Sequence, residues 1–250
     1  MELEALERRW NEAGKEDPFW AVLSEPDKKG NRWQADEFFR TGVDEINQVM
    51  ADVARLGVAV SRRRALDFGC GPGRLTQALG AHFQQVDGVD ISPSMIALAD
   101  RLNRRPDRCR YHLNESDDLR RFADQTFDLV YSSITLQHVG PDNARSYLKE
   151  FIRVLVPGGL LVFQLPGRQT GLLRRLKKFI PTPLLAAYHR LRYRGHPAAA
   201  MDGIPRQDVV RFCESNGATI LEVQANHAAG AGWESFRYYG RRLLAPDSRT

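Results

Sequence analysis

The chain has 250 residues, of which 42% are hydrophobic and 27% are charged, with 20 glycines and 13 prolines. This size fits one domain with elaborations, and the composition excludes collagen, low-complexity disorder and coiled coils. No apolar run approaches the roughly 18 residues that span a bilayer, no signal peptide is visible, and three scattered cysteines suit neither a disulfide framework nor a zinc site. We therefore expect a cytoplasmic protein without a metal.

The net charge of +5 belongs to one segment. Between Arg168 and Arg194 there are eight arginines and lysines and no acidic residue, which leaves 28 basic and 31 acidic side chains, or a charge of −3, for the rest. General nucleic-acid binding is therefore a poor inference from the basic charge.

The N-terminal region is expected to be helical. Hydrophobic residues recur at helical spacing over residues 35–56, which predicts an amphipathic helix of about six turns. A shorter helix around Leu3–Trp10 precedes it, and a stretch rich in proline and tryptophan, Pro18–Trp33, joins the two. We expect residues 1–60 to form a helical cap and residues 61–250 to form the main domain.

From Ala65 onward, short apolar runs alternate with helical ones. The predicted strands are 65–68, 85–90, 110–113, 127–132 and 160–165, and the predicted helices are 75–83, one from Pro93 with Ser92 as its N-cap, 142–155 and 205–216. Two last strands, 219–224 and about 234–239, should form an antiparallel edge. The pattern predicts an α/β fold: a mostly parallel sheet with an antiparallel last strand and helices on both faces. Residues 167–203 fit neither period and are interpreted as an insertion.

The turn after the first strand is rich in glycine. Gly69, Gly71 and Gly73 let the backbone turn sharply and approach a ligand more closely than a side chain would permit. Open α/β sheets bind ligands at this edge. The dinucleotide-binding spacing G-x-G-x-x-G fails at Arg74. The alternative is a tight turn in which the glycines serve packing alone.

With Asp67, the turn has the spacing D-x-G-x-G-x-G. It resembles motif I of the class I S-adenosylmethionine (SAM) dependent methyltransferases, and the resemblance extends from about Arg64 to Leu165. Other landmarks follow in the family's order: the strand ending in Asp90, the loop 114–119, the strand 127–133 and an L-x-P-G-G turn at 155–159. The resemblance implies a Rossmann-like sheet that binds SAM and releases S-adenosylhomocysteine.

The resemblance also implies which residues hold the cofactor. Asp90, followed by Ile91, would hold both ribose hydroxyls with its two acceptor oxygens. Glu115, or Asp117 in another loop register, would accept from the adenine amino group. The remaining expected contacts are Asp67 near the methionine end, where capping of the next helix is the alternative, Gly69, Gly71 and Gly73 of the turn, and the backbone of Ser116 and Ser133.

Catalysis requires a base only if the acceptor must lose a proton. His138 lies just beyond the fourth strand, where many small-molecule members of the family carry a histidine, and its ordinary pKa suits a base. Packing at a helix start is the alternative for this residue. Trp33, Phe38, Phe39 and Arg40 would cover SAM, with plain packing as the alternative for the aromatic residues.

A small-molecule or lipid-linked acceptor, methylated at O, N or C, is the preferred interpretation. Tyr131–Ile134 stands where the adenine- and glutamine-modifying branches carry Asn/Asp-Pro-Pro-aromatic, and the Pro-Cys pair of the cytosine-5 enzymes is missing. The alternatives are an RNA methyltransferase and a SAM-binding regulatory protein without turnover.

The basic segment predicts two short amphipathic helices on either side of Pro181-Thr182-Pro183. One interpretation is a lid whose apolar face closes over the acceptor. The second is peripheral contact of residues 168–194 with the anionic inner face of a membrane, which would suit a lipid-linked acceptor. Nucleic acid is the least favoured partner.

Overall fold

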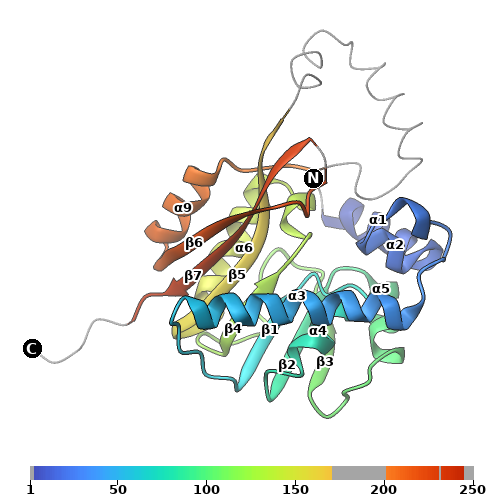
Figure 1. The fold of residues 1–250 in the computed structure, drawn as a ribbon, viewed down its shortest axis with the longest axis horizontal. Helices are drawn as coiled ribbons and strands as arrows, with labels where there is room; N and C mark the ends of the chain where they lie inside the picture. The colour runs from blue at the N-terminus through green and yellow to red at the C-terminus, as the bar shows by residue number, and fades with distance from the viewer. Residues whose placement is uncertain (1–2, 171–200, 231, 245–250) are drawn as a thin grey trace, which may run out of the picture.

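The computed structural model describes residues 3–170, 201–230 and 232–244 (Figure 1). The described α-helices are α1 (Leu3–Glu16), α2 (Pro18–Val22), α3 (Ala35–Arg55), α4 (Arg74–Leu79), α5 (Pro93–Arg101), α6 (Pro141–Val154) and α9 (Arg206–Ser215). The described strands are β1 (Arg64–Phe68), β2 (Gln85–Asp90), β3 (Cys109–Leu113), β4 (Phe127–Ser132), β5 (Leu155–Gln169), β6 (Ala218–Asn226) and β7 (Trp233–Arg242). Two short 3₁₀ helices are η1 (Pro26–Lys28) and η2 (Leu136–His138).

The strands form one sheet in the order β3-β2-β1-β4-β5-β7-β6. Neighbours among β1 to β5 are parallel, and β7 runs antiparallel to both β5 and β6. The predicted fold class is therefore confirmed. The last two strands do pair, but β6 forms the edge, because β5 continues to Gln169 and gives β7 a partner from Leu160 to its end.

Helices cover both faces of the sheet (Figure 1). Alternate residues of β4 point to opposite faces: Leu129 and Tyr131 pack in a cluster with residues of α3, α4 and α5, whereas Val130 packs with α6 and α9. The helix after β2 begins as expected, because Ser92 Oγ accepts the N–H of Met95 at 3.2 Å. The domain core is thus built on both sides of the central strands.

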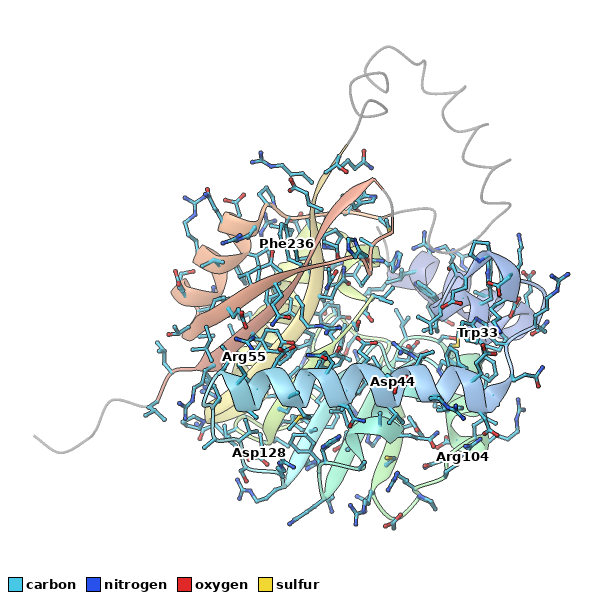
Figure 2. All side chains as sticks on the ribbon, viewed as in Figure 1. Trp33, Asp44, Arg55, Arg104, Asp128 and Phe236 are labelled. Carbon is cyan, nitrogen blue, oxygen red and sulfur yellow. The ribbon has the colours of Figure 1, made fainter. Side chains whose placement is uncertain are left out.

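One N-terminal helix packs against the sheet, and the other two lie away from that face. Helix α3 crosses the strands, with Trp33 beside its first turn and Arg55 at its far end (Figure 2), and its Ile46 and Val49 are fully buried against the sheet. Helices α1 and α2 lie off this face, and α1 contacts α5 (Figure 1). The division of the chain at residue 60 stays a prediction.

The start of the expected insertion, at about residue 167, overlaps the end of β5. Residues 167–169 belong to β5, and the N–H of Thr170 still donates to the carbonyl of Gly232. On the other side of this segment, the N–H of Asp202 donates to the carbonyl of Gln137, and the N–H of the buried Ile204 donates to the carbonyl of Pro166. Residues 171–200, with the two predicted helices, lie outside the described residues. Among the helices that the structure describes, none is long and apolar enough to cross a membrane.

Candidate active site

A pocket opens at the carboxyl ends of β1, β2 and β4. The strand order changes direction between β1 and β4, and such switch points are where open α/β sheets bind ligands. The space between its walls is about 730 Å³, part of which is open to solvent. Its floor comes from the strand ends and their loops, and its outer wall comes from α1 and α2.

The glycine-rich turn contributes two of its three glycines to the pocket. Gly69, Gly71 and Gly73 all have positive φ, at 75°, 51° and 87°, a conformation that strains other residues. Gly69 and Gly71 line the pocket, and a Cβ on Gly69 would lie 2.1 Å from Thr135 Oγ1. Gly73 does not line it; a Cβ there would meet the hydroxyl of Tyr111 at 2.3 Å. The first two glycines form the cradle, and the third serves packing.

Asp90 supplies a carboxylate to the pocket at the end of β2. Its Oδ2 accepts the N–H of Gly71 at 2.8 Å, and its Oδ1 accepts the N–H of Ser92 at 2.9 Å. Burial raises the pKa of Asp90, and these backbone donors offset part of that effect. Ile91 lines the pocket beside it. The acid is thus held in place with lone pairs left to accept from a ligand's hydroxyl groups.

Asp67 lies behind the cradle and does not line the pocket. Its side chain is fully buried, and Thr76 Oγ1 donates to its Oδ2 at 2.6 Å. Its Oδ1 has no hydrogen-bond partner among the described residues. Burial raises the pKa of Asp67 to about 7, because removing an ionised carboxylate from water is costly.

Replacing Asp67 with asparagine should stabilise the protein at neutral pH. Because the folded pKa is about 7 and the ordinary value is 3.8, the native state binds the extra proton between these values, and the free energy of unfolding falls as pH rises through the window. At pH 8 the variant should be more stable than the parent by up to about 4 kcal/mol. Urea unfolding between pH 4 and 8 measures this, with the exposed Asp100→Asn as control. Identical pH profiles for Asp67→Asn and the parent would contradict it.

The loop after β3 places a different residue in the pocket from those expected. Asn114 lines the pocket, and its side-chain amide donates to the carbonyl of Ser116 at 2.9 Å. Glu115, Ser116 and Asp117 are exposed and do not line it. The hydroxyl of Tyr147, another lining residue, also donates to the carbonyl of Ser116. The structure thus brings the edge of this loop, but not the Glu115 carboxylate, to the pocket.

A buried charge network that the sequence did not reveal lies behind Ser133, a lining residue. Glu45 Oε1 accepts from Ser133 Oγ at 2.9 Å, Tyr131 Oη at 2.6 Å and Arg237 Nη2 at 2.9 Å, and Oε2 accepts from Arg74 Nη2 at 2.8 Å. Burial alone would raise the pKa of Glu45, but the two arginines and the Tyr131 hydrogen bond lower it to about 2. Helix α3 is thereby tied to the pocket floor.

His138 lines the pocket at the end of η2, and its side chain is only 2% exposed. Its ring meets Trp10 of α1 edge-on, with 5.3 Å between the ring centres. Gln137 Nε2 lies 3.1 Å from His138 Nε2. Of the expected site residues, the structure therefore groups His138 with Gly69, Gly71, Asp90, Ile91 and Ser133.

The aromatic residues before and within α3 do not cover the pocket. Trp33, Phe38 and Phe39 form a cluster with Phe19 of α2, which agrees with the packing alternative, and Arg40 is exposed. The outer wall instead consists of Leu6, Trp10, Ala21 and Val22. Leu6 and Trp10 are four residues apart in a predicted helix and therefore share one face of it. This spacing is the sequence signal that could have identified the wall.

Comparisons with known proteins identify a methyltransferase domain in the chain. A family model described as a methyltransferase domain matches residues 66–163. A ubiquinone biosynthesis O-methyltransferase of Coxiella burnetii is 29% identical over 185 residues, 73% of this chain and 74% of the relative. A trans-aconitate 2-methyltransferase of Variovorax paradoxus is 34% identical over 121 residues, 47% of this chain and 44% of the relative.

The fold also matches a solved structure over nearly its whole length. A magnesium protoporphyrin IX methyltransferase from Synechocystis PCC 6803, crystallised with S-adenosylhomocysteine, superposes with a TM-score of 0.67 at 16% identity, covering 96% of this chain and 99% of that one. Sequence, fold and site together define a SAM-dependent enzyme. Residues 66–163 match the methyltransferase family model, and the relatives and the fold agree with a SAM-dependent methyltransferase.

The residues of the pocket fit SAM. Gly69 and Gly71 present backbone without side chains to a ligand, the Asp90 carboxylate suits a ribose diol, and Val89, Met95 and Leu6 offer apolar surface to a flat ring. In the described part of the chain, no group of three or more His, Cys, Asp or Glu side chains could hold a metal ion.

Proposed function

We propose that this methyltransferase acts on a small organic acceptor that enters beside His138. The observation that carries the proposal is that the apolar side chains of Trp10, Ala21 and Val22 line the same pocket as His138. Two of the relatives, the ubiquinone biosynthesis O-methyltransferase and the trans-aconitate 2-methyltransferase, support a small-molecule acceptor. A lipid-linked acceptor and membrane contact through residues 168–194 stay predictions, because residues 171–200 lie outside the described residues.

The pocket residues contribute to the reaction by positioning the reactants and excluding water from them. When bound, SAM supplies a methyl group on sulfonium sulfur, and the acceptor's lone pair forms the new bond as the carbon–sulfur bond breaks and leaves its electrons on sulfur. Asp90 and the Gly69–Gly71 cradle fix the cofactor side, while the apolar wall excludes water and limits the acceptor's orientation. Such alignment supplies much of the rate enhancement for an activated donor. His138 is assigned to the acceptor side of the pocket.

A labelled-methyl assay tests the proposal directly. The purified protein is incubated with methyl-labelled SAM and cell extract, and the products are separated into water-soluble small molecules, lipids, protein and RNA. Label in the small-molecule or lipid fraction is expected, and these two fractions distinguish a free from a lipid-linked acceptor. Label confined to RNA or protein, or SAM binding without transfer to any fraction, would contradict the proposed acceptor.

Replacing Asp90 with alanine should weaken SAM binding about tenfold or more. The carboxylate is expected to accept charge-assisted hydrogen bonds from the ribose, each worth roughly 1.5–3 kcal/mol. Titration calorimetry with SAM and S-adenosylhomocysteine measures the effect, after thermal unfolding has shown that the loop tied to Gly71 still folds. Asp100→Ala, an exposed acid on the following helix, is the matched control. An unchanged affinity for Asp90→Ala would show that the ribose lies elsewhere.

A further inference from the structure

Four almost fully buried polar side chains form a continuous hydrogen-bonded chain behind the pocket. His138 and Gln137 are each 2% exposed, Gln164 is 1% exposed and Ser235 is 3% exposed. The chain runs from η2 through β5 to β7. Because an unpaired buried polar group is costly, each member's donor or acceptor role constrains that of its neighbour.

The direction of this chain is set by a backbone group. The N–H of Ile134 donates to Gln164 Oε1 at 3.0 Å, and a backbone N–H can only donate. Gln164 Oε1 is therefore an acceptor, and its amide nitrogen faces Gln137 Oε1 at 3.2 Å and Ser235 Oγ at 2.9 Å. Ile134 itself is a β-branched residue at φ 60°, a strained conformation that this bond helps to hold.

The same direction is imposed from the other end. The N–H of Ala228 donates to Asn226 Oδ1 at 3.2 Å, and Ser235 Oγ donates to the same oxygen at 2.5 Å. Because the Ser235 hydroxyl donates its only hydrogen to Asn226, it can only accept a hydrogen bond from Gln164. Two separate backbone donors give the amides one consistent orientation.

These hydrogen bonds determine which ring nitrogen of His138 carries the proton. Since Gln137 Oε1 accepts from Gln164, the amide nitrogen of Gln137 is the atom that faces His138 Nε2, at 3.1 Å. An amide NH₂ donates and cannot accept, so Nε2 must present its lone pair. A neutral imidazole with an unprotonated Nε2 carries its proton on Nδ1.

We propose that Gln137 and Gln164 are positioning residues that hold His138 in its Nδ1–H tautomer with the Nε2 lone pair engaged. Protonation at Nε2 would turn two donors toward each other and would break the amide chain back to Ile134. The catalytic consequence rests on the proposed function: because Gln137 engages the Nε2 lone pair, Nε2 does not serve as the base that the family resemblance implies.

Nitrogen NMR of the purified protein without SAM tests the tautomer independently of activity. Long-range proton–nitrogen spectra of ¹⁵N-labelled protein at a pH where the ring is neutral distinguish the two ring nitrogens, and a His138→Asn variant identifies the signals. We expect a pyridine-type Nε2 and a pyrrole-type Nδ1. A pyrrole-type Nε2 in the parent protein would overturn the proposal, whether or not the enzyme transfers methyl groups.

Two variants test the role of the glutamines. Gln137→Met and Gln164→Met keep the side-chain length but remove the amide, so the Nε2 resonance should move from the pyridine-type toward the pyrrole-type range in both. The exposed Gln207→Met should leave it in place. Each of the two methionine variants must first retain the parent's circular dichroism spectrum. If its Nε2 resonance then does not move, the amide chain does not set the tautomer. If a methionine variant does not fold, glutamate, which has nearly the same size as glutamine, replaces the same residue. A shifted Nε2 resonance in the glutamate variant would again support the proposal, and an unmoved one would contradict it.

Discussion

Replacing Glu45 with alanine is expected to destabilise the protein by about 3–5 kcal/mol. Its side chain is 16% exposed, and its carboxylate pairs with Arg74 and Arg237, whose side chains are 4% and 15% exposed. Removing one partner of a buried ion pair leaves the other charge uncompensated. The Nε atoms of both arginines already have no partner among the described residues, so the loss of Glu45 would leave two poorly satisfied cations. Chemical denaturation at pH 7 measures the change.

The same residue should make the protein sensitive to acid. The folded pKa of Glu45 is about 2, and the ordinary value is 4.5. A carboxyl group with a lowered folded pKa stabilises the protein above the ordinary value, and this contribution is lost as pH falls toward 2. It amounts to about 3 kcal/mol, so the free energy of unfolding of the parent should drop through this window more steeply than that of Glu45→Gln.

The neighbouring acid on the same helix provides the control. Asp44 is exposed on α3 (Figure 2), and replacing an exposed residue changes stability by about 0.5 kcal/mol or less. Asp44→Ala should therefore unfold like the parent. If Glu45→Ala proved as stable as Asp44→Ala, the network would contribute nothing to folding, and its link from α3 to Ser133 would have no energetic meaning.

Much of the fold could be predicted because its local signals are strong. The apolar run of β4 was predicted as residues 127–132 and observed with those bounds, and β2 likewise. The helix expected over 75–83 ends at Leu79, before Gly80, and the chain continues as turns. Periodicity locates an element well, but its ends depend on individual turns and tertiary contacts.

The site was only partly predictable from the sequence, because some of its contacts join residues that are far apart along the chain. Glu45 and Arg237 are 192 residues apart in the sequence, and no local pattern pairs a charge on a helix with one on a strand so far away. Asn114 follows β3, and its N–H donates to the carbonyl of Asp90, which brings it to the pocket ahead of Glu115. That one-residue register depends on how β3 pairs with β2. Motif spacing alone does not determine it.

Replacing His138 with alanine is expected to lower turnover about 10²-fold or more while SAM affinity stays nearly constant. The ring lines the pocket, and the proposed function assigns it to the acceptor side, so its loss should affect the reacting complex more than cofactor binding. Turnover with the acceptor found by the labelling assay, together with calorimetry for SAM, measures the two effects separately. His82→Ala, a histidine outside the pocket lining, should retain the parent's turnover. Equal turnover in His138→Ala would leave alignment by the pocket walls as the whole of catalysis.

A second substitution at the same position separates the two roles of the ring. A glutamine amide can donate a hydrogen bond but cannot take a proton near neutral pH. If the ring acts by hydrogen bonding and not as a base, His138→Gln should recover part of the turnover that His138→Ala loses, because a polar side chain that can donate an N–H is restored at this position. If the ring instead accepts the acceptor's proton, both variants should be equally slow. Since Gln137 donates toward Nε2 at 3.1 Å, and its own orientation is fixed through Gln164 by the N–H of Ile134, we expect the glutamine variant to be the faster of the two.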